Sequence, residues 1–90
     1  MKITDFESNK SIFTTSYAIN DKKDIVYVSI DEDLDLQMFT DEGADMENAM
    51  VVSLKDMLEI DNSISILPEF EKGDAFQRTD KKAAWVKITE

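Results

Sequence analysis

The order of hydrophobic and polar residues predicts four strands in the first sixty residues of the chain. Residues 11–19 are rich in β-branched and aromatic side chains, which favour a strand. Residues 25–30 are apolar on both faces, which is typical of a central strand. Residues 34–38 alternate strictly between apolar and polar, and 49–52 form a short apolar run. In the first segment, four side chains would share one face: Phe13, Thr15, Tyr17 and Ile19.

A short helix is predicted directly after the fourth strand. Ser53 is a favoured helix N-cap, and Asp56 follows three residues later in the position of a capping box. Leu54, Met57 and Leu58 then recur at the spacing of one helix face. The chain therefore changes from the two-residue period of a strand to the period of a helix near residue 53.

Two further strands are predicted at residues 74–78 and 83–88. In the second, Trp85 would lie on the face opposite Ala84, Val86 and Ile88. Connections are short throughout, which favours antiparallel pairing, because a parallel crossover needs about a dozen residues or more. We therefore expect one α+β domain over residues 1–90, a mainly antiparallel twisted sheet of about five to six strands with one short helix on one face.

Charge is concentrated in the middle of the chain. The net charge of the protein is −10, yet residues 31–71 alone hold thirteen acids and one base, Lys55, a net charge of −12. Such a negative surface repels nucleic acid and membranes and attracts basic partners. The alternative is that these acids serve only solubility.

The residue types needed for most catalytic chemistry are missing. The chain has no histidine and no cysteine, so the commonest general base, the usual transition-metal ligands and a thiolate nucleophile are absent. The two isolated glycines cannot form a phosphate-binding loop. We therefore expect a protein that is not an enzyme and needs no cofactor. No apolar run approaches the roughly 20 residues of a membrane span, and we expect a cytoplasmic protein.

Calcium binding is an alternative interpretation of the acidic segment. Asp31, Asp33 and Asp35 occupy the first, third and fifth positions of an EF-hand-like loop, and Glu42 falls at the twelfth. The sixth position holds Leu36, where the sharp turn of such a loop requires glycine. A plain acidic hairpin is the better interpretation, and we assign no metal ligands.

Partner contacts are expected from the acids of residues 31–47 and from the single tryptophan. Tryptophan is favoured at the centres of protein interfaces, but for one tryptophan in a small domain core packing is the favoured interpretation. The candidate partner-binding residues are Asp31, Glu32, Asp33, Asp35, Asp41, Glu42, Asp45, Glu47 and Trp85.

Several segments resemble a known family. Residues 51–64 read VVSLKDMLEIDNSI and residues 73–78 read GDAFQR, and both are similar to motifs of a bacterial family of unknown function. That family includes the immunity proteins of type thirty-three in polymorphic toxin systems. Upstream, IVYV at residues 25–28 and the acidic hairpin after it also resemble the family, so the likeness spans residues 12–88. The resemblance implies an α+β cytoplasmic protein that binds and neutralises a toxin domain, and it implies no catalytic residues.

Three functional hypotheses follow. In the first, the chain is an immunity-type protein whose acidic segment binds a basic toxin domain. In the second, it is a housekeeping or regulatory binding module without a toxin partner, and its binding surface is apolar and near Trp85. In the third, it is a carboxylate-based enzyme or a calcium binder. The first is favoured, since toxin nucleases hold phosphates in positive clefts that a negative protein complements.

Overall fold

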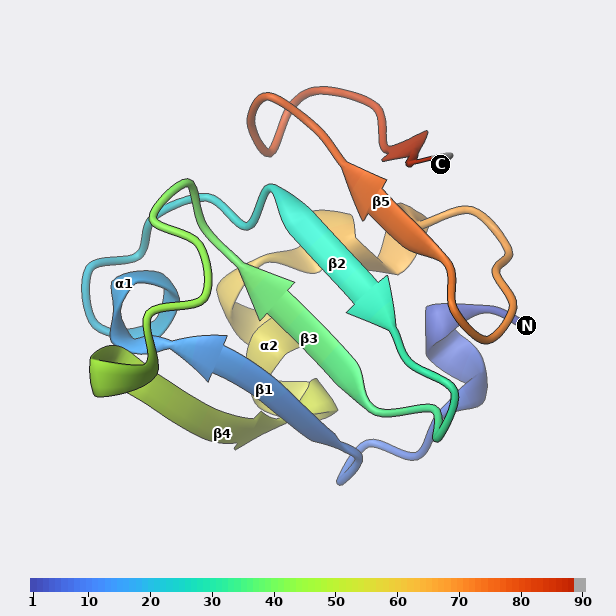
Figure 1. Ribbon diagram of the computed structural model, residues 1–90, viewed down its shortest axis with the longest axis horizontal. Helices are drawn as coiled ribbons and strands as arrows, with labels where there is room; N and C mark the ends of the chain where they lie inside the picture. Colours follow the sequence, from blue (N-terminus) through green and yellow to red (C-terminus); the bar gives the residue numbers. More distant parts are fainter. Residues whose placement is uncertain (89–90) are drawn as a thin grey trace.

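A six-stranded sheet forms the centre of the protein (Figure 1). The structure is a computed structural model and describes residues 1–88. The strands are β1 (Ser11–Thr15), β2 (Tyr27–Ile30), β3 (Leu36–Phe39), β4 (Ala49–Ser53), β5 (Ala75–Gln77) and β6 (Val86–Lys87). The helices are α1 (Ser16–Ile19) and α2 (Leu54–Ile60), with 3-10 turns η1 (Ile3–Asp5), η2 (Met46–Asn48) and η3 (Asn62–Ile66). The expected α+β class is confirmed.

The strands lie in the order β4-β1-β3-β2-β5-β6, and all neighbours but one are antiparallel. The exception is β1 with β3, which pair in parallel with Ile12 opposite Leu36. The short connections of the sequence did not predict this parallel pair. It is possible because the chain between β1 and β3 contains both α1 and β2, which together are long enough for a crossover.

The prediction of one strand over residues 11–19 is wrong after Thr15, where the chain turns into α1. Strand propensity at Tyr17 and Ile19 is overridden by tertiary contacts. Tyr17 donates a hydrogen bond of 2.9 Å from its hydroxyl to Asp45, and Ala18 is fully buried in the core. The chain therefore leaves the sheet four residues earlier than its β-branched and aromatic pattern suggests.

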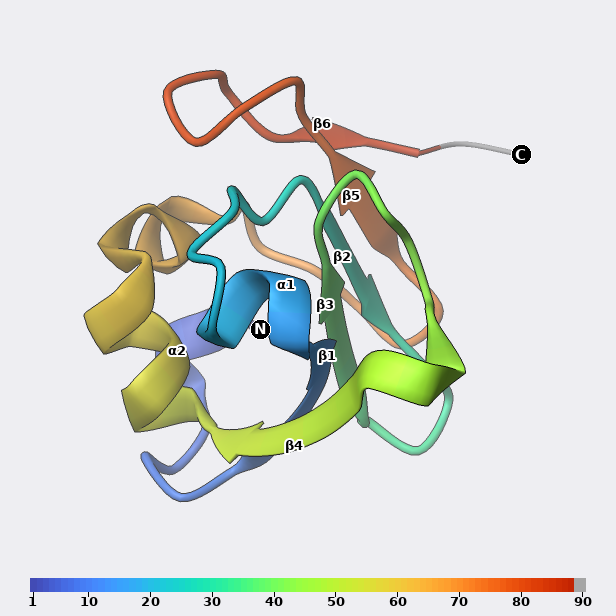
Figure 2. The ribbon, with the colours of Figure 1, turned by 90° about the vertical axis from the view of Figure 1, so that its left-hand side faces the viewer.

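Both α-helices pack on the same face of the sheet, and neither covers the opposite face (Figure 2). The core lies between the sheet and these helices. Its largest fully buried side chains are Ile3, Ile12, Ile25, Val28, Ile30, Leu36, Met38, Leu54, Met57, Ile64, Phe70 and Phe76. The domain is thus a two-layer structure with one open sheet face.

The predicted cap of α2 is confirmed. The Ser53 hydroxyl accepts a hydrogen bond of 3.1 Å from the backbone N–H of Asp56, which satisfies one of the free donors of the first turn. Leu54 and Met57 face the core and are buried. The helix ends at Ile60, and the Asp61 side chain then caps η3 through the N–H of Ser63.

The last strand differs from its prediction. It is shorter than the predicted 83–88, because the strand that pairs with β5 is Val86–Lys87. The predicted alternation holds, since Trp85 is 8% exposed and Val86 on the opposite face is 58% exposed. Trp85 turns inward because its ring stacks on the guanidinium of Arg78, 4.0 Å from the ring centroid.

Candidate protein-binding surface

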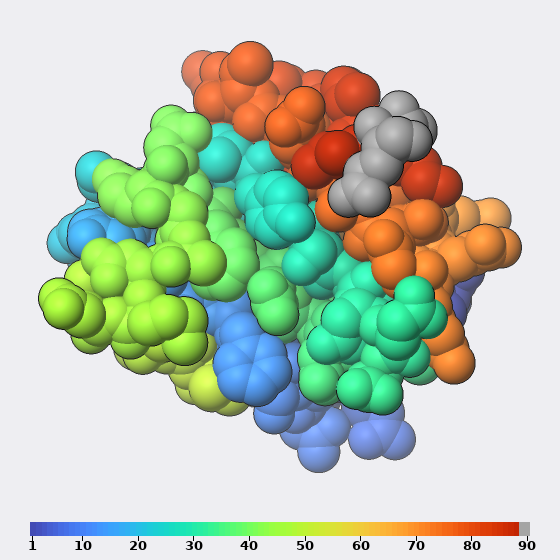
Figure 3. All heavy atoms as spheres, in the orientation of Figure 1, coloured from blue at the N-terminus to red at the C-terminus, as the bar shows by residue number. Residues whose placement is uncertain are grey.

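The face of the sheet that no α-helix covers carries the best candidate surface. We call it the open face and define it by the outward side chains of the first five strands. Alternation along each strand assigns to it Phe13, Thr15, Tyr27, Ser29, Gln37, Phe39, Ala49, Val51, Ala75 and Gln77. Figure 3 shows this face, with the green and yellow-green atoms of residues 40–48 along one side of its centre. It combines aromatic rings with polar amides and small side chains.

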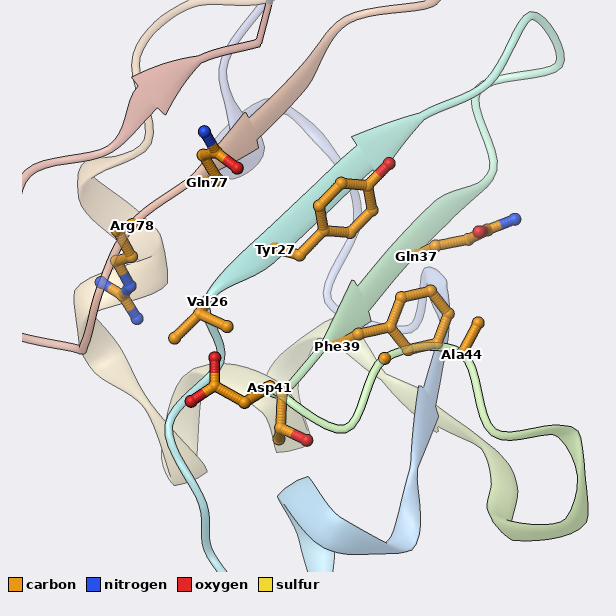
Figure 4. Close-up of a pocket in the computed structure, with 10 residues that line it drawn as sticks. Val26, Tyr27, Gln37, Phe39, Asp41, Ala44, Gln77 and Arg78 are labelled. Carbon is orange, nitrogen blue, oxygen red and sulfur yellow. The ribbon is translucent and has the colours of Figure 1, made fainter.

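Three aromatic side chains form the centre of the open face. Tyr27 of β2 and Phe39 of β3 are direct cross-strand neighbours, and their rings stack with centroids 6.3 Å apart (Figure 4). Phe13 of β1 lies opposite Gln37 of β3 and is 43% exposed. Tyr27 and Phe39 are half-buried. Partly exposed rings on a rigid sheet lose little conformational entropy on binding, which makes them suitable anchors for a partner.

Two shallow hollows lie on the open face, on either side of Phe39. The Tyr27 hollow, of about 490 Å³, includes Tyr27, Phe39, Asp41, Gln77 and Arg78 in its lining (Figure 4). The Phe13 hollow, of about 380 Å³, is lined by Phe13, Thr14, Thr15, Asp31, Asp35, Gln37, Phe39, Ala44, Asp45, Met46 and Ala49. Both have mainly apolar walls and at least one aspartate at the rim.

The loop of residues 40–48 is fixed by its own polar contacts. Glu42 pairs with Lys23 and accepts a hydrogen bond of 2.5 Å from the Thr40 hydroxyl, and these contacts lower the pKa of Glu42 to about 2. Asp45 accepts hydrogen bonds from Asn48 (2.8 Å) and Tyr17 (2.9 Å), which lower its pKa. The same Asp45 contact raises the pKa of Tyr17. Glu42 and Asp45 are therefore ionised side chains that hold the loop against α1 and the chain after it.

The acidic hairpin between β2 and β3 is organised around Asp31. One oxygen of its side chain accepts the backbone N–H groups of Asp33 and Asp35, at 2.9 and 2.8 Å. Leu34 takes a positive φ of 65°, so the chain turns where the sequence predicted the start of a strand. One carboxylate oxygen from each of the three aspartates lies within 4.8 Å of the others. Glu42, the remaining EF-hand candidate, instead pairs with Lys23.

The candidate acids divide into three groups. Asp31, Asp35, Asp41 and Asp45 line the two hollows. Glu42 holds the neighbouring loop, and Glu32, Asp33 and Glu47 are exposed residues outside both hollows. The structure thus brings half of the candidate acids to the edge of the open face. Strand alternation could have indicated the three aromatic residues beside them, but the sequence interpretation did not select these residues.

Trp85 lies in the core, as part of a buried polar network. The Arg78 guanidinium donates hydrogen bonds of 2.8 Å to Asp61, to the Ser63 hydroxyl and to the backbone oxygen of Ile25. Its plane stacks on the ring of Trp85. Burial lowers the pKa of Arg78, while the Asp61 carboxylate opposes that shift. Little of Trp85 is left for a partner, so we do not include it in the candidate surface.

The same network joins residues of two sequence segments, 51–64 and 73–78. Asp61 and Ser63 close the first motif and Arg78 closes the second, and the fold joins them in one ion pair and one hydrogen bond. Their role in this chain is to attach the segment after β5 to η3. These motif residues are structural rather than part of a surface.

The fold and the open face together define a small α+β domain with an acidic and aromatic surface. The chain matches no protein-family model, no curated protein and no solved structure. Within residues 1–88, no helix has the length and apolar character needed to cross a membrane.

Proposed function

We propose that the protein is a binding module of the immunity type, which neutralises a basic toxin domain by covering it with the open face. The observation that carries this proposal is the coincidence of one exposed and two half-buried aromatic rings with four hollow-lining aspartates on the uncovered face of the sheet. The family resemblance of the sequence supports the same function. The rings would supply desolvated contact area, and the acids would supply selectivity for a basic partner.

Electrostatics favour this assignment over a solvated face without a partner. A protein of net charge −10 attracts a positive cleft over several ångströms and raises the association rate, and salt weakens this effect. Asp35 and Asp41 accept no side-chain hydrogen bond within residues 1–88, whereas Glu42 and Asp45 are engaged in the loop. Asp35 and Asp41 are thus available to a partner without loss of internal contacts.

The proposal predicts that a gene beside that of this protein encodes a toxin-like C-terminal domain, and the direct test is co-expression with that domain. We expect the protein to restore growth and to bind the purified domain, with an affinity that falls as salt rises. The double variant Asp35→Lys/Asp41→Lys should weaken binding at least tenfold. Its matched control, Glu59→Lys/Glu69→Lys, changes the net charge equally at exposed sites outside the open face and should lose less than threefold.

The housekeeping alternative gives different results in the same experiment. If the acids serve only solubility, both double variants bind as the wild type does. Equal losses in the two variants would mean that only net charge matters, and would reject the open face as the binding site. Absence of both rescue and binding would reject the immunity function.

A further inference from the structure

The Phe13 hollow is lined mainly by apolar side chains, together with acidic ones. Phe13 and Phe39 supply aromatic walls, and Ala44, Met46 and Ala49 supply aliphatic ones. Of the described residues that line it, every charged one is an aspartate: Asp31, Asp35 and Asp45. The Tyr27 hollow differs, because its lining includes one aspartate, Asp41, and the side chain of its other charged residue, Arg78, is buried against Asp61. The Phe13 hollow is therefore suited to an occupant with an apolar stem and a positive end.

A second, independent feature points to an occupant. Thr15 lines the Phe13 hollow and is only 1% exposed, and its hydroxyl oxygen has no hydrogen-bond partner within residues 1–88. It belongs to the same strand face as Phe13, so its side chain lies on the hollow's side of the sheet. A buried hydroxyl without a partner is costly, and a donor that enters the hollow would remove that cost.

We infer that the Phe13 hollow binds an arginine side chain of the partner protein. This inference rests on the proposed function and names the contact at its centre. The arginine stem packs between Phe13 and Phe39, and the guanidinium donates to Asp35 and to the Thr15 hydroxyl. Planar guanidinium stacks on aromatic rings and is less strongly hydrated than an ammonium, which favours arginine over lysine in a partly enclosed aromatic site.

The test uses small probes and does not require the partner. N-acetyl-arginine methylamide is titrated into the 15N-labelled full chain, beside its citrulline and norleucine counterparts. Citrulline keeps the shape of arginine and removes its charge, while norleucine keeps only the stem. We expect the arginine probe to bind with a Kd on the order of 1 mM and to shift the amides of Phe13, Thr15, Asp35 and Phe39. The other two probes should bind at least fivefold more weakly.

Three substitutions locate the site. Asp35→Asn and Thr15→Val preserve side-chain shape, and each should weaken the arginine probe by about fivefold. The matched control is Asp33→Asn, which removes an equal charge from the same hairpin but outside the lining of the hollow. It should change the affinity by less than twofold.

Several outcomes would overturn the inference. These are equal binding of the citrulline or norleucine probe, an equal loss from Asp33→Asn and Asp35→Asn, or no binding of the arginine probe at 20 mM. Calcium binding tighter than the arginine probe at the same amides would also overturn it, in favour of a cation site. Failure of the probe with intact toxin binding would reject only the arginine contact. Probe binding without toxin binding would reject the proposed function and retain the hollow.

Discussion

Replacement of Arg78 by methionine tests the buried network that fixes the C-terminal part of the domain. The Arg78 side chain is fully buried and that of Asp61 is 8% exposed, so the substitution leaves a carboxylate without its counter-charge in a low-dielectric site. Breaking a buried pair in this way costs about 3–5 kcal/mol. A chain of this length has a total stability of about 5–13 kcal/mol, so Arg78→Met should remove a large part of it.

The assay is urea unfolding followed by far-UV circular dichroism. With a slope typical of a small domain, a loss of 3–5 kcal/mol lowers the unfolding midpoint by about 2–3 M urea. The double variant Asp61→Asn/Arg78→Met leaves no buried charge and should recover at least about 1 kcal/mol in a double-mutant cycle. Lys82→Met, an exposed base in the same segment, should cost under about 0.5 kcal/mol. A loss below about 1 kcal/mol for Arg78→Met would refute the reasoning.

Three further predictions concern a turn, the pH dependence of stability and an edge strand. Lys22 is exposed at a φ of 53°, so Lys22→Gly should raise the free energy of unfolding by about 0.5–1 kcal/mol in urea titrations. Glu42 has a pKa of about 2 in the folded state against an ordinary value of 4.5, so the unfolded state takes up the proton first. Stability should therefore be complete above about pH 4.5 and fall toward pH 2, and Glu42→Gln should reduce this slope in thermal unfolding. The backbone N–H of Leu54 donates to the carbonyl oxygen of Lys10, and this bond continues the β1–β4 ladder. Because N–H groups along an antiparallel strand point alternately toward and away from the neighbouring strand, the N–H of Val52 faces β1 and that of Val51 faces outward. Val51→Pro should keep the fold by circular dichroism, whereas Val52→Pro should lose it.

The elements that the sequence predicted well are those with an unambiguous local pattern. Residues 25–30 are apolar on both faces and 49–52 form a continuous apolar run, and both overlap strands of the sheet. The cap at Ser53 is a contact between residues three apart, so spacing alone was sufficient to predict it. In these segments, local preference and tertiary packing agree.

The elements that were not predicted depend on contacts between distant residues. The end of β1 at Thr15 depends on Tyr17 meeting Asp45, twenty-eight residues away. The parallel pairing of β1 with β3 places Ile12 opposite Leu36, which is far from it in the sequence. No periodicity within one segment contains this information.

The candidate surface was predicted in part, for a similar reason. The acidic block is visible as composition, and four of its aspartates do line the hollows of the open face. The aromatic centre required the sheet order, because Phe13 and Tyr27 belong to different strands on either side of β3. Phe13 is exposed and Tyr27 half-buried because no α-helix covers that face, which no residue of either strand determines.

The central claim is that the open face is the partner-binding surface. The most direct measurement is amide hydrogen exchange of the protein with and without the toxin-like domain that the proposed function predicts as its partner. We predict slower exchange on binding in β1, β3 and residues 40–48, with α2 and η3 unchanged. Slower exchange confined to α2 and η3, with the open face unchanged, would contradict the account.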